Sequence, residues 1–304
     1  MKFGKLQDIS TVNFSLPNDP PSTQSILAGL SPPTTPTLYV GCTGWSMKEW
    51  VGHVYPANAK TKDYLTHYAK QFNTIELNTT HYRIPNFETV QKWKTTSATD
   101  FRFCPKVPQA ISHSSGMGLN DGKLRAFAES IQQLEEKMGC CFLQMPPYFD
   151  ASRLAILATF LDKFPVNLPL AIEVRHESWF RNEHSLLPLV ELTKAKNCAL
   201  VITDVAGRRD VLHQQLTNHI AMIRFVGNDL HSTDYTRIDE WVQRLKKWFA
   251  AGIAEVYFFT HEPDNIKAPE LAKYLVEQAK KHLPTITTRG PEFIKEQGQQ
   301  MSLF

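Results

Sequence analysis

The sequence has few cysteines, and none of them is spaced to bind a metal. Five cysteines are present, an odd number, and no two form a Cys-x-x-Cys pair. This spacing argues against a disulfide framework and against a thiolate metal site, and it is typical of proteins in a reducing cytoplasm. No apolar run approaches the roughly 18 residues of a membrane-spanning helix. The first ten residues lack the apolar core of a secretory signal. We therefore expect a cytoplasmic protein with no membrane partner.

An excess of one charge is also absent. The chain has 33 Lys and Arg residues against 30 Asp and Glu residues, which gives a net charge of +3. The chain as a whole is therefore not a polycation, and any nucleic-acid site must be a local patch. Hydrophobic residues make up 42% of the 304 residues. That is enough to bury a sizeable core in one large domain or two ordinary ones.

Short β-branched and aromatic runs alternate with stretches of helical period along most of the chain. The eight runs begin at Leu38, Thr74, Phe101, Cys140, Leu170, Ala199, Ala221 and Glu255. Eight strands alternating with helices over about 250 residues predict an α/β fold, a single (β/α)₈ TIM-type barrel. The alternative is an open doubly wound sheet, whose usual Gly-x-Gly-x-x-Gly turn is absent here.

Both ends of the chain differ in composition from this central part. Residues 1–37 are rich in Pro, Ser and Thr, which predicts an extended arm, with a disordered leader as the alternative. Residues 38–285 are predicted to form the barrel domain. Residues 286–304 are predicted to form a short flexible tail.

In such barrels the active site lies at the carboxyl ends of the strands, so we examined which side chains point inward there. Side chains alternate along a strand, and the apolar positions mark the outer face. The polar residues that this alternation places inside, towards the strand ends, are Glu76, Asn78, Lys106, Gln144, Glu173, Arg175 and Arg224. Unpaired buried charges are costly, so these groups need each other or a ligand.

Three cations are expected to converge with two carboxylates at this edge. Lys106, Arg175 and Arg224 are suited to binding a phosphate or a carboxylate. Glu76 and Glu173 are then the candidate catalytic residues, one of them acting as general acid or base. The alternative is an internal salt-bridge network with no catalytic role.

Histidines and aromatic residues also follow the strands. His81, His113, His176 and His261 lie there, but their spacing matches no metal motif, so no metal ligand is assigned and the cofactor is unknown. Tyr82 and Trp179 are suited to stacking on a base or a sugar ring, with packing of the pocket wall as the equal alternative.

Several motifs resemble the YecE-like family, domain of unknown function 72. They are Gly41–Trp45, Ile75–Pro85, the segment from Lys106 to His113, Glu173–Phe180 and Met222–Gly227. The resemblance implies a (β/α)₈ barrel of unassigned activity. It also supports a set of pocket residues: Glu76, Asn78, Tyr82, Lys106, Glu173, Arg175, Trp179 and Arg224. The chain departs from the family at His81, where relatives usually have Phe. It departs again after the last strand, where it reads FFTHEPDN rather than a Phe-Asn-Asn-like sequence.

The last five residues resemble the peptide by which bacterial replication and repair proteins dock on the DNA polymerase sliding clamp. Gln300 is suited to a directional hydrogen bond, and Met301, Leu303 and Phe304 to an apolar groove. The alternative is a tail that folds Leu303 and Phe304 onto its own domain.

Three functions remain open from the sequence. The first is an enzyme, with a hydrolase or lyase favoured, acting on a phosphate-bearing substrate in a repair-type transaction linked to the clamp. The second is a small-molecule enzyme for a sugar phosphate or carboxylate, with Glu76 and Glu173 as its acid–base pair. The third is a non-catalytic binding module.

Overall fold

The computed structural model describes residues 4–294, where strands and helices alternate as the sequence predicts. The strands are β1 (Thr37–Gly41), β2 (Thr74–Leu77), β3 (Arg102–Pro105), β4 (Cys141–Gln144), β5 (Leu170–Glu173), β6 (Ala199–Asp204), β7 (Ile220–Val226), β8 (Glu255–His261) and β9 (Thr287–Thr288). The helices are α1 (Pro21–Ala28), α2 (Tyr64–Gln71), α3 (Phe87–Thr96), α4 (Gln109–Ser112), α5 (Lys123–Gln132), α6 (Leu154–Lys163), α7 (Leu187–Ala195), α8 (Ser232–Ala250) and α9 (Ala268–His282).

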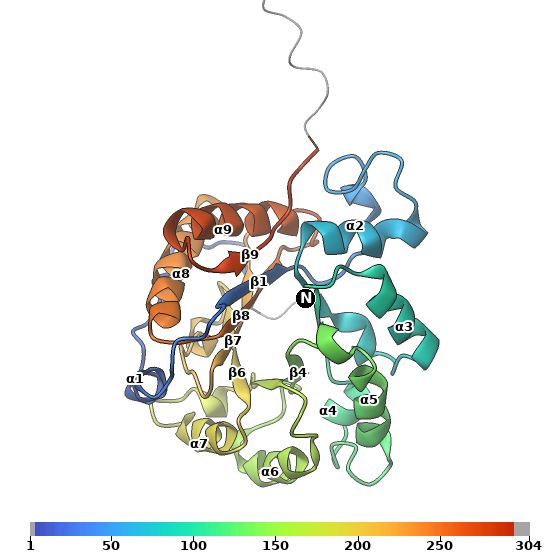
Figure 1. Ribbon diagram of the computed structural model, residues 1–304. Coiled ribbons are helices and arrows are strands. Elements are labelled where there is room, and N and C mark those ends of the chain that lie inside the picture. Colours follow the sequence, from blue (N-terminus) through green and yellow to red (C-terminus); the bar gives the residue numbers. More distant parts are fainter. Residues whose placement is uncertain (1–3, 295–304) are drawn as a thin grey trace, which may run out of the picture.

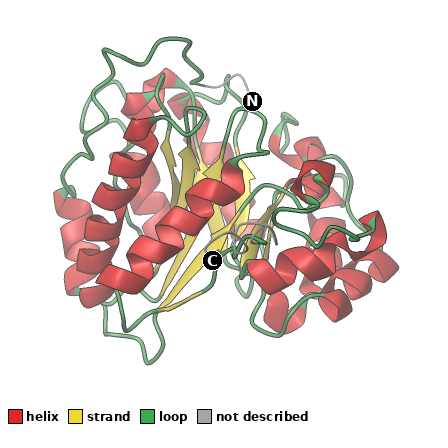
Figure 2. Cartoon of the chain, turned by 90° about the horizontal axis from the view of Figure 1, so that it is seen from above, coloured by secondary structure: helices red, strands yellow, loops and turns green. Residues whose placement is uncertain are grey.

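The strands pair in parallel, in two sheets. Seven strands follow the order β4-β5-β6-β7-β8-β1-β9, and β2 pairs with β3. A few backbone hydrogen bonds connect the pair to its neighbours. Glu76 N donates to Cys42 O at 3.0 Å on one side, and Gly139 N to Phe103 O at 2.8 Å and Val107 N to Phe142 O at 2.9 Å on the other. The strands lie at the centre with the helices around them (Figure 1), and helices flank them on both sides when the molecule is seen from above (Figure 2). The chain therefore has an α/β fold built on a parallel sheet.

Alternation along the strands divides the core into an inner and an outer layer. Ile75 of β2 and Ile172 of β5 pack outward beneath the helices, as predicted. Phe142 of β4 and Met222 of β7 pack inward, with Phe259 of β8 beside them. Each such side chain contributes roughly 1.5–3 kcal/mol on burial. The inner layer fills the space below the polar strand ends and so supports the charged groups above it.

The N-terminal arm differs from the extended segment that its composition predicts. Helix α1 starts at Pro21, because proline suits the first position of a helix, where no backbone N–H is needed. Thr23 is fully buried and donates its hydroxyl to Gln214 O at 2.8 Å. Arg244 of α8 donates to Asp19 Oδ1 at 2.6 Å. The arm is thus held against the domain at Asp19 and along α1, and outside α1 residues 4–36 form no helix or strand.

Part of the predicted tail also packs against the domain. Thr287 and Thr288 form β9 beside β1, and Ile294 N donates to His53 O at 2.9 Å. Threonine is β-branched and suits an edge strand, which composition alone does not reveal at two residues. Four residues of the clamp-like peptide, Gln300, Met301, Leu303 and Phe304, lie outside the described residues. Within residues 4–294, none of the helices combines the length and apolar character needed to cross a bilayer.

Candidate functional site

A buried ionic cluster lies at the carboxyl ends of β2, β5 and β7, centred on Arg224. Glu76, Glu173 and Arg224 are at most 2% exposed. They meet there because parallel strands end at the same edge and the inward positions of the three strands face one another. The convergence that the sequence predicts is therefore present for these three residues.

The Arg224 guanidinium bridges the two carboxylates. Nε and Nη2 donate to the two oxygens of Glu76 at 2.8 and 3.0 Å, and Nη1 donates to the two oxygens of Glu173 at 3.2 and 3.0 Å. Burial opposes ionisation of both acids, but the neighbouring cations outweigh it. The pKa of Glu173 is lowered to about 2, and that of Glu76 lies well below its usual range. Both side chains are held as carboxylates at neutral pH.

Glu76 has two further partners. Asn78, after β2, donates its amide to Glu76 Oε1 at 2.9 Å, and His261, at the end of β8, lies with Nε2 3.0 Å from Glu76 Oε2. Burial is the main reason that the pKa of His261 is lowered. A neutral imidazole beside a carboxylate places its proton on the nearer nitrogen, so Nε2 is the donor. Asn78 is thus in the predicted site, bound to a carboxylate.

Glu173 is surrounded in the same way. Gln144 donates its amide to Oε2 at 2.7 Å, Arg175 donates Nε to Oε1 at 2.9 Å, and Thr203 of β6 donates its hydroxyl to Oε1 at 3.2 Å. Gln144 and Arg175 are both predicted site residues, and both are buried here. Each carboxylate is therefore saturated with donors, which fixes its orientation.

Lys106 completes the predicted set and has a different environment. Its ammonium is buried and donates to the neutral Gln144 Oε1 at 2.8 Å, 5.8 Å from the centre of the Phe142 ring. Within residues 4–294 it forms no salt bridge. Burial and the nearby Arg224 charge lower its pKa to about 8. The ammonium is thus still largely protonated at pH 7, without a carboxylate of its own.

Two imidazoles lie beside Lys106, on the loops after β2 and β3. His81 Nδ1 lies 3.1 Å from Val107 O, and its ring centre lies 5.5 Å from that of His113. Burial and the positive charge of Lys106 lower the pKa of both rings, that of His81 to about 4. Both are therefore neutral at pH 7 and can accept a proton.

The two predicted stacking residues have different positions. Tyr82 is 75% exposed at the rim, against the His81 ring. Trp179 is 1% exposed, stacks on Phe149 and donates its indole N–H to Phe149 O at 2.8 Å. Trp179 is buried in the outer layer, away from the ionic cluster. It therefore packs in the wall of the pocket, which is the alternative that the sequence left open.

His261 and Thr203 contact the cluster but were not assigned to it from the sequence, although strand alternation indicates both. In β8 Tyr257 and Phe259 point inward, and the same alternation places His261 inside. In β6 it places Thr203 beside Val201 on the inner face. Among the described residues, no group of three or more His, Cys, Asp or Glu side chains is arranged to hold a metal ion.

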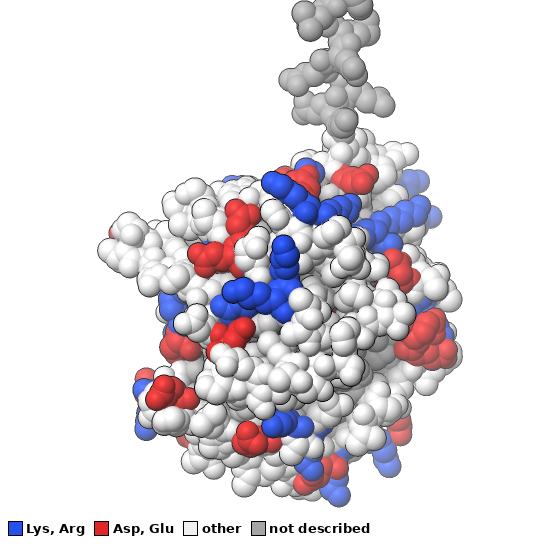
Figure 3. Space-filling model, turned by 60° about the vertical axis from the view of Figure 1, so that its left-hand side comes forward, with Lys and Arg blue, Asp and Glu red and all other residues white. Residues whose placement is uncertain are grey.

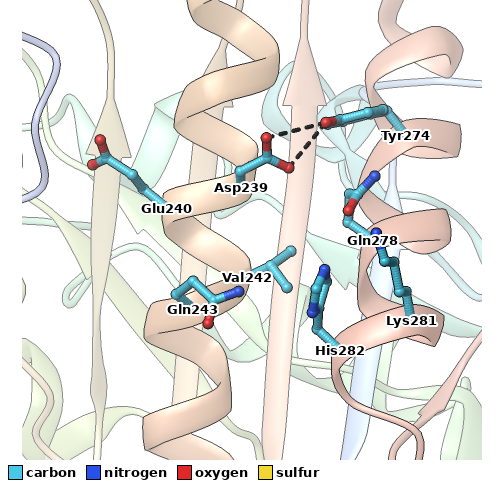
Figure 4. Close-up of a pocket in the computed structure, with 8 residues that line it drawn as sticks. All are labelled: Asp239, Glu240, Val242, Gln243, Tyr274, Gln278, Lys281 and His282. Atoms are coloured by element: carbon cyan, nitrogen blue, oxygen red, sulfur yellow. Dashed lines mark hydrogen bonds between the residues drawn. The ribbon is translucent and has the colours of Figure 1, made fainter.

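A separate groove lies on the outer helix layer, between α8 and α9. Its volume is about 520 Å³, and Tyr274 donates its hydroxyl to both oxygens of Asp239, at 2.9 and 3.1 Å (Figure 4). Glu240, Lys281 and His282 also line it. No lining residue belongs to the ionic cluster, so the groove is not part of the strand-end site.

Comparison with known proteins gives one consistent result. The family model described as "Protein of unknown function DUF72" matches residues 39–293. The UPF0759 protein YecE of Escherichia coli (strain K12) is 31% identical over 267 residues, which is 82% of this chain and 95% of that protein. The UPF0759 protein YunF of Bacillus subtilis (strain 168) is 27% identical over 150 residues, 47% of this chain and 52% of that protein. The crystal structure of a DUF72 family protein from Enterococcus faecalis V583 has a TM-score of 0.62 at 22% identity. It covers 80% of this chain and 97% of that one, and it shows a shared fold.

Proposed function

The chain belongs to the DUF72 family of proteins of unknown function, and from this premise we propose that it binds a phosphate-bearing ligand between Lys106 and Arg175. We also propose that its two sheets close into one (β/α)₈ barrel. The bonds from Glu76 N to Cys42 O and from Val107 N to Phe142 O support closure, because they lie where β1 would pair with β2, and β3 with β4, in a closed barrel. The five cysteines of the chain are unpaired and buried, which supports a reducing compartment such as the cytoplasm.

The charge balance of the cluster carries the proposal. Arg224 is matched by Glu76 and Glu173, and Arg175 shares Glu173 with it. Lys106, by contrast, donates to the neutral amide oxygen of Gln144. A buried ammonium without a carboxylate is costly, and a bound anion offsets that cost. The ends of β3 and β5 are thus the place for a phosphate.

The cluster also suggests how the catalytic roles divide. Glu76 and Glu173 are ionised and saturated with donors, so we assign them to holding Arg224 and Arg175 in place. Proton transfer is better suited to His81 and His113, which are neutral at pH 7 and lie beside the proposed phosphate site. This division supports a hydrolase or lyase of a phosphate ester over the small-molecule enzyme with a Glu–Glu acid–base pair.

Calorimetric titration of the full chain with inorganic phosphate and ribose 5-phosphate tests the proposal. Lys106→Met is expected to weaken the binding of both ligands, because methionine has a side chain of similar length without the charge. Lys137→Met is the matched control. Lys137 is an equally buried lysine that donates to Ser97 O at 2.7 Å, away from the cluster. Equal phosphate affinity in the wild type and Lys106→Met contradicts the proposal and favours a non-catalytic module.

A nucleic-acid role linked to the sliding clamp is a second proposal, supported by the peptide Gln300–Phe304. On the face drawn in Figure 3, basic side chains gather near the centre and along the upper right, with acidic side chains beside both groups. If the protein acts on DNA, the strand-end site and the peptide are the features that support it.

A further inference from the structure

Four ring side chains follow one another along the rim of the strand-end site. Tyr82 lies edge-on to His81, with ring centres 5.3 Å apart, and His81 lies edge-on to His113 at 5.5 Å. Tyr148, on the loop after β4, donates its hydroxyl to the His113 carbonyl at 2.9 Å. The outer members, Tyr82 and Tyr148, are 75% and 57% exposed. Two tyrosines therefore present ring surface to solvent on either side of the two imidazoles.

Both tyrosines are held by the backbone around them. Tyr148 follows Pro146 and Pro147, whose rings fix the backbone, and the turn closes through Phe149 N to Pro146 O at 3.0 Å. Tyr82 ends the short 3-10 turn η3 (Asn78–His81). The buried Thr80 in that turn donates to both Leu77 O and Lys106 O. An aromatic ring on a fixed backbone loses little entropy when a ligand covers it.

The rim is continuous with the buried cations. The hydroxyl of Thr80, two residues before Tyr82, bonds the carbonyl of Lys106 itself. Gln144, the last residue of β4, accepts from Lys106 Nζ, and Tyr148 lies on the loop that follows this strand. The buried ammonium and the four rings are therefore carried by neighbouring strand ends, with Arg175 after the next strand, β5.

We propose that the ligand is a nucleotide, either free or at the end of a single strand, whose phosphate lies at Lys106 and Arg175 and whose base stacks on Tyr82 or Tyr148. This rests on the proposed phosphate site and names the rest of the ligand. A planar base fits exposed tyrosine rings, and a phosphate ester fits the cations beneath them. The two imidazoles then lie along the sugar.

The test compares adenosine 5′-phosphate with ribose 5-phosphate in calorimetric titrations of the full chain. The nucleotide is expected to bind more tightly, because only it carries a base. Affinity for the nucleotide is expected to fall in Tyr82→Ala, in Tyr148→Ala and in the double variant. Stacking energies correspond to about 5- to 150-fold in affinity, so the double variant is expected to fall in this range. Ribose 5-phosphate affinity is expected to stay unchanged.

Two matched control variants distinguish the contribution of the tyrosine rings to binding from that of their hydroxyls. Tyr82→Phe and Tyr148→Phe keep the ring, and they are expected to keep the affinity for the nucleotide. A short single-stranded oligonucleotide with a terminal phosphate distinguishes the source of the nucleotide. Tighter binding than adenosine 5′-phosphate identifies a strand end, and equal binding identifies the free nucleotide.

The outcomes distinguish this inference from the phosphate site on which it rests. One outcome is that both ligands bind with equal affinity, that Lys106→Met weakens both, and that the double alanine variant changes neither. The phosphate site then stands and the stacking inference is overturned. If neither ligand responds to Lys106→Met, the phosphate site is wrong and the inference falls with it.

Discussion

Arg224→Met removes the cation that joins the two buried carboxylates, and its effect on stability can be worked out from the contacts. Four hydrogen bonds from Arg224 to Glu76 and Glu173 are lost, all within 3.2 Å. Their gross strength overstates the loss, because burying the guanidinium is itself costly. Removing one partner of a buried ion pair typically costs about 3–5 kcal/mol, since the other charge is left unpaired. That is a large part of the roughly 5–15 kcal/mol that stabilises a domain.

The pH dependence separates this explanation from a simple packing defect. In the wild type the pKa of Glu173 is lowered to about 2, so its contribution is present above the unfolded pKa and is lost as pH falls through the folded one. Without Arg224 the folded pKa rises. The difference in unfolding free energy between wild type and variant is therefore full at about pH 7 and shrinks below about pH 4.

Urea denaturation followed by tryptophan fluorescence measures both quantities. Arg224→Met combined with Glu76→Gln and Glu173→Gln is the matched control, because neutral amides no longer need a cation. The triple variant is expected to recover part of the stability at about pH 7 and to lose the pH dependence. A loss below about 1 kcal/mol in Arg224→Met, or one that is equal at both pH values, refutes the assignment of Arg224 as the bridge.

Two further predictions concern other parts of the chain. Burial raises the pKa of Glu262 to about 7, although its carboxylate accepts from Asp229 N at 2.8 Å. The contribution of Glu262 to stability is therefore present at low pH and is lost as pH rises through that value. Glu262→Gln is expected to remove about 3 kcal/mol of the decline in unfolding free energy between about pH 4.5 and about pH 7.5, and identical curves for variant and wild type argue against this. Deleting Leu303 and Phe304 is expected to abolish binding to a sliding clamp and to leave the melting temperature unchanged, and a clear fall in melting temperature shows instead that the two residues belong to the fold.

Strand alternation explains why much of the site could be predicted from the sequence. Gln144, Glu173 and Arg224 each share a face with a buried apolar residue of the inner layer, and the apolar neighbours of Glu76 lie on the outer face. The direction of these side chains therefore follows from their position in the strand. The pairing could not be predicted in the same way. Arg224 meets Glu76 across 148 positions in the chain, and only the arrangement of the strands in space decides that one cation holds both acids.

Residues in loops were less predictable, because no period fixes their direction. Tyr82 and Trp179 both follow a strand, yet one lies exposed at the rim and the other is buried in the wall. The short turn after β5 directs Trp179 outward, where Phe149 O accepts its N–H. The arm was misjudged for a related reason. Its prolines suggested extended chain, but Pro21 stands where a helix begins.

The presence of an anion at Lys106 is the central claim, and a crystal of the full chain soaked in arsenate, a phosphate analogue that scatters anomalously, tests it most directly. We predict an anomalous peak from the arsenic atom within about 4 Å of Lys106 Nζ, on the side that faces Arg175, because an arsenate oxygen lies between the two at hydrogen-bond distance. The same soak of Lys106→Met is predicted to lose that peak. A map of the wild type with no peak at Lys106, or an unchanged peak in Lys106→Met, contradicts the account.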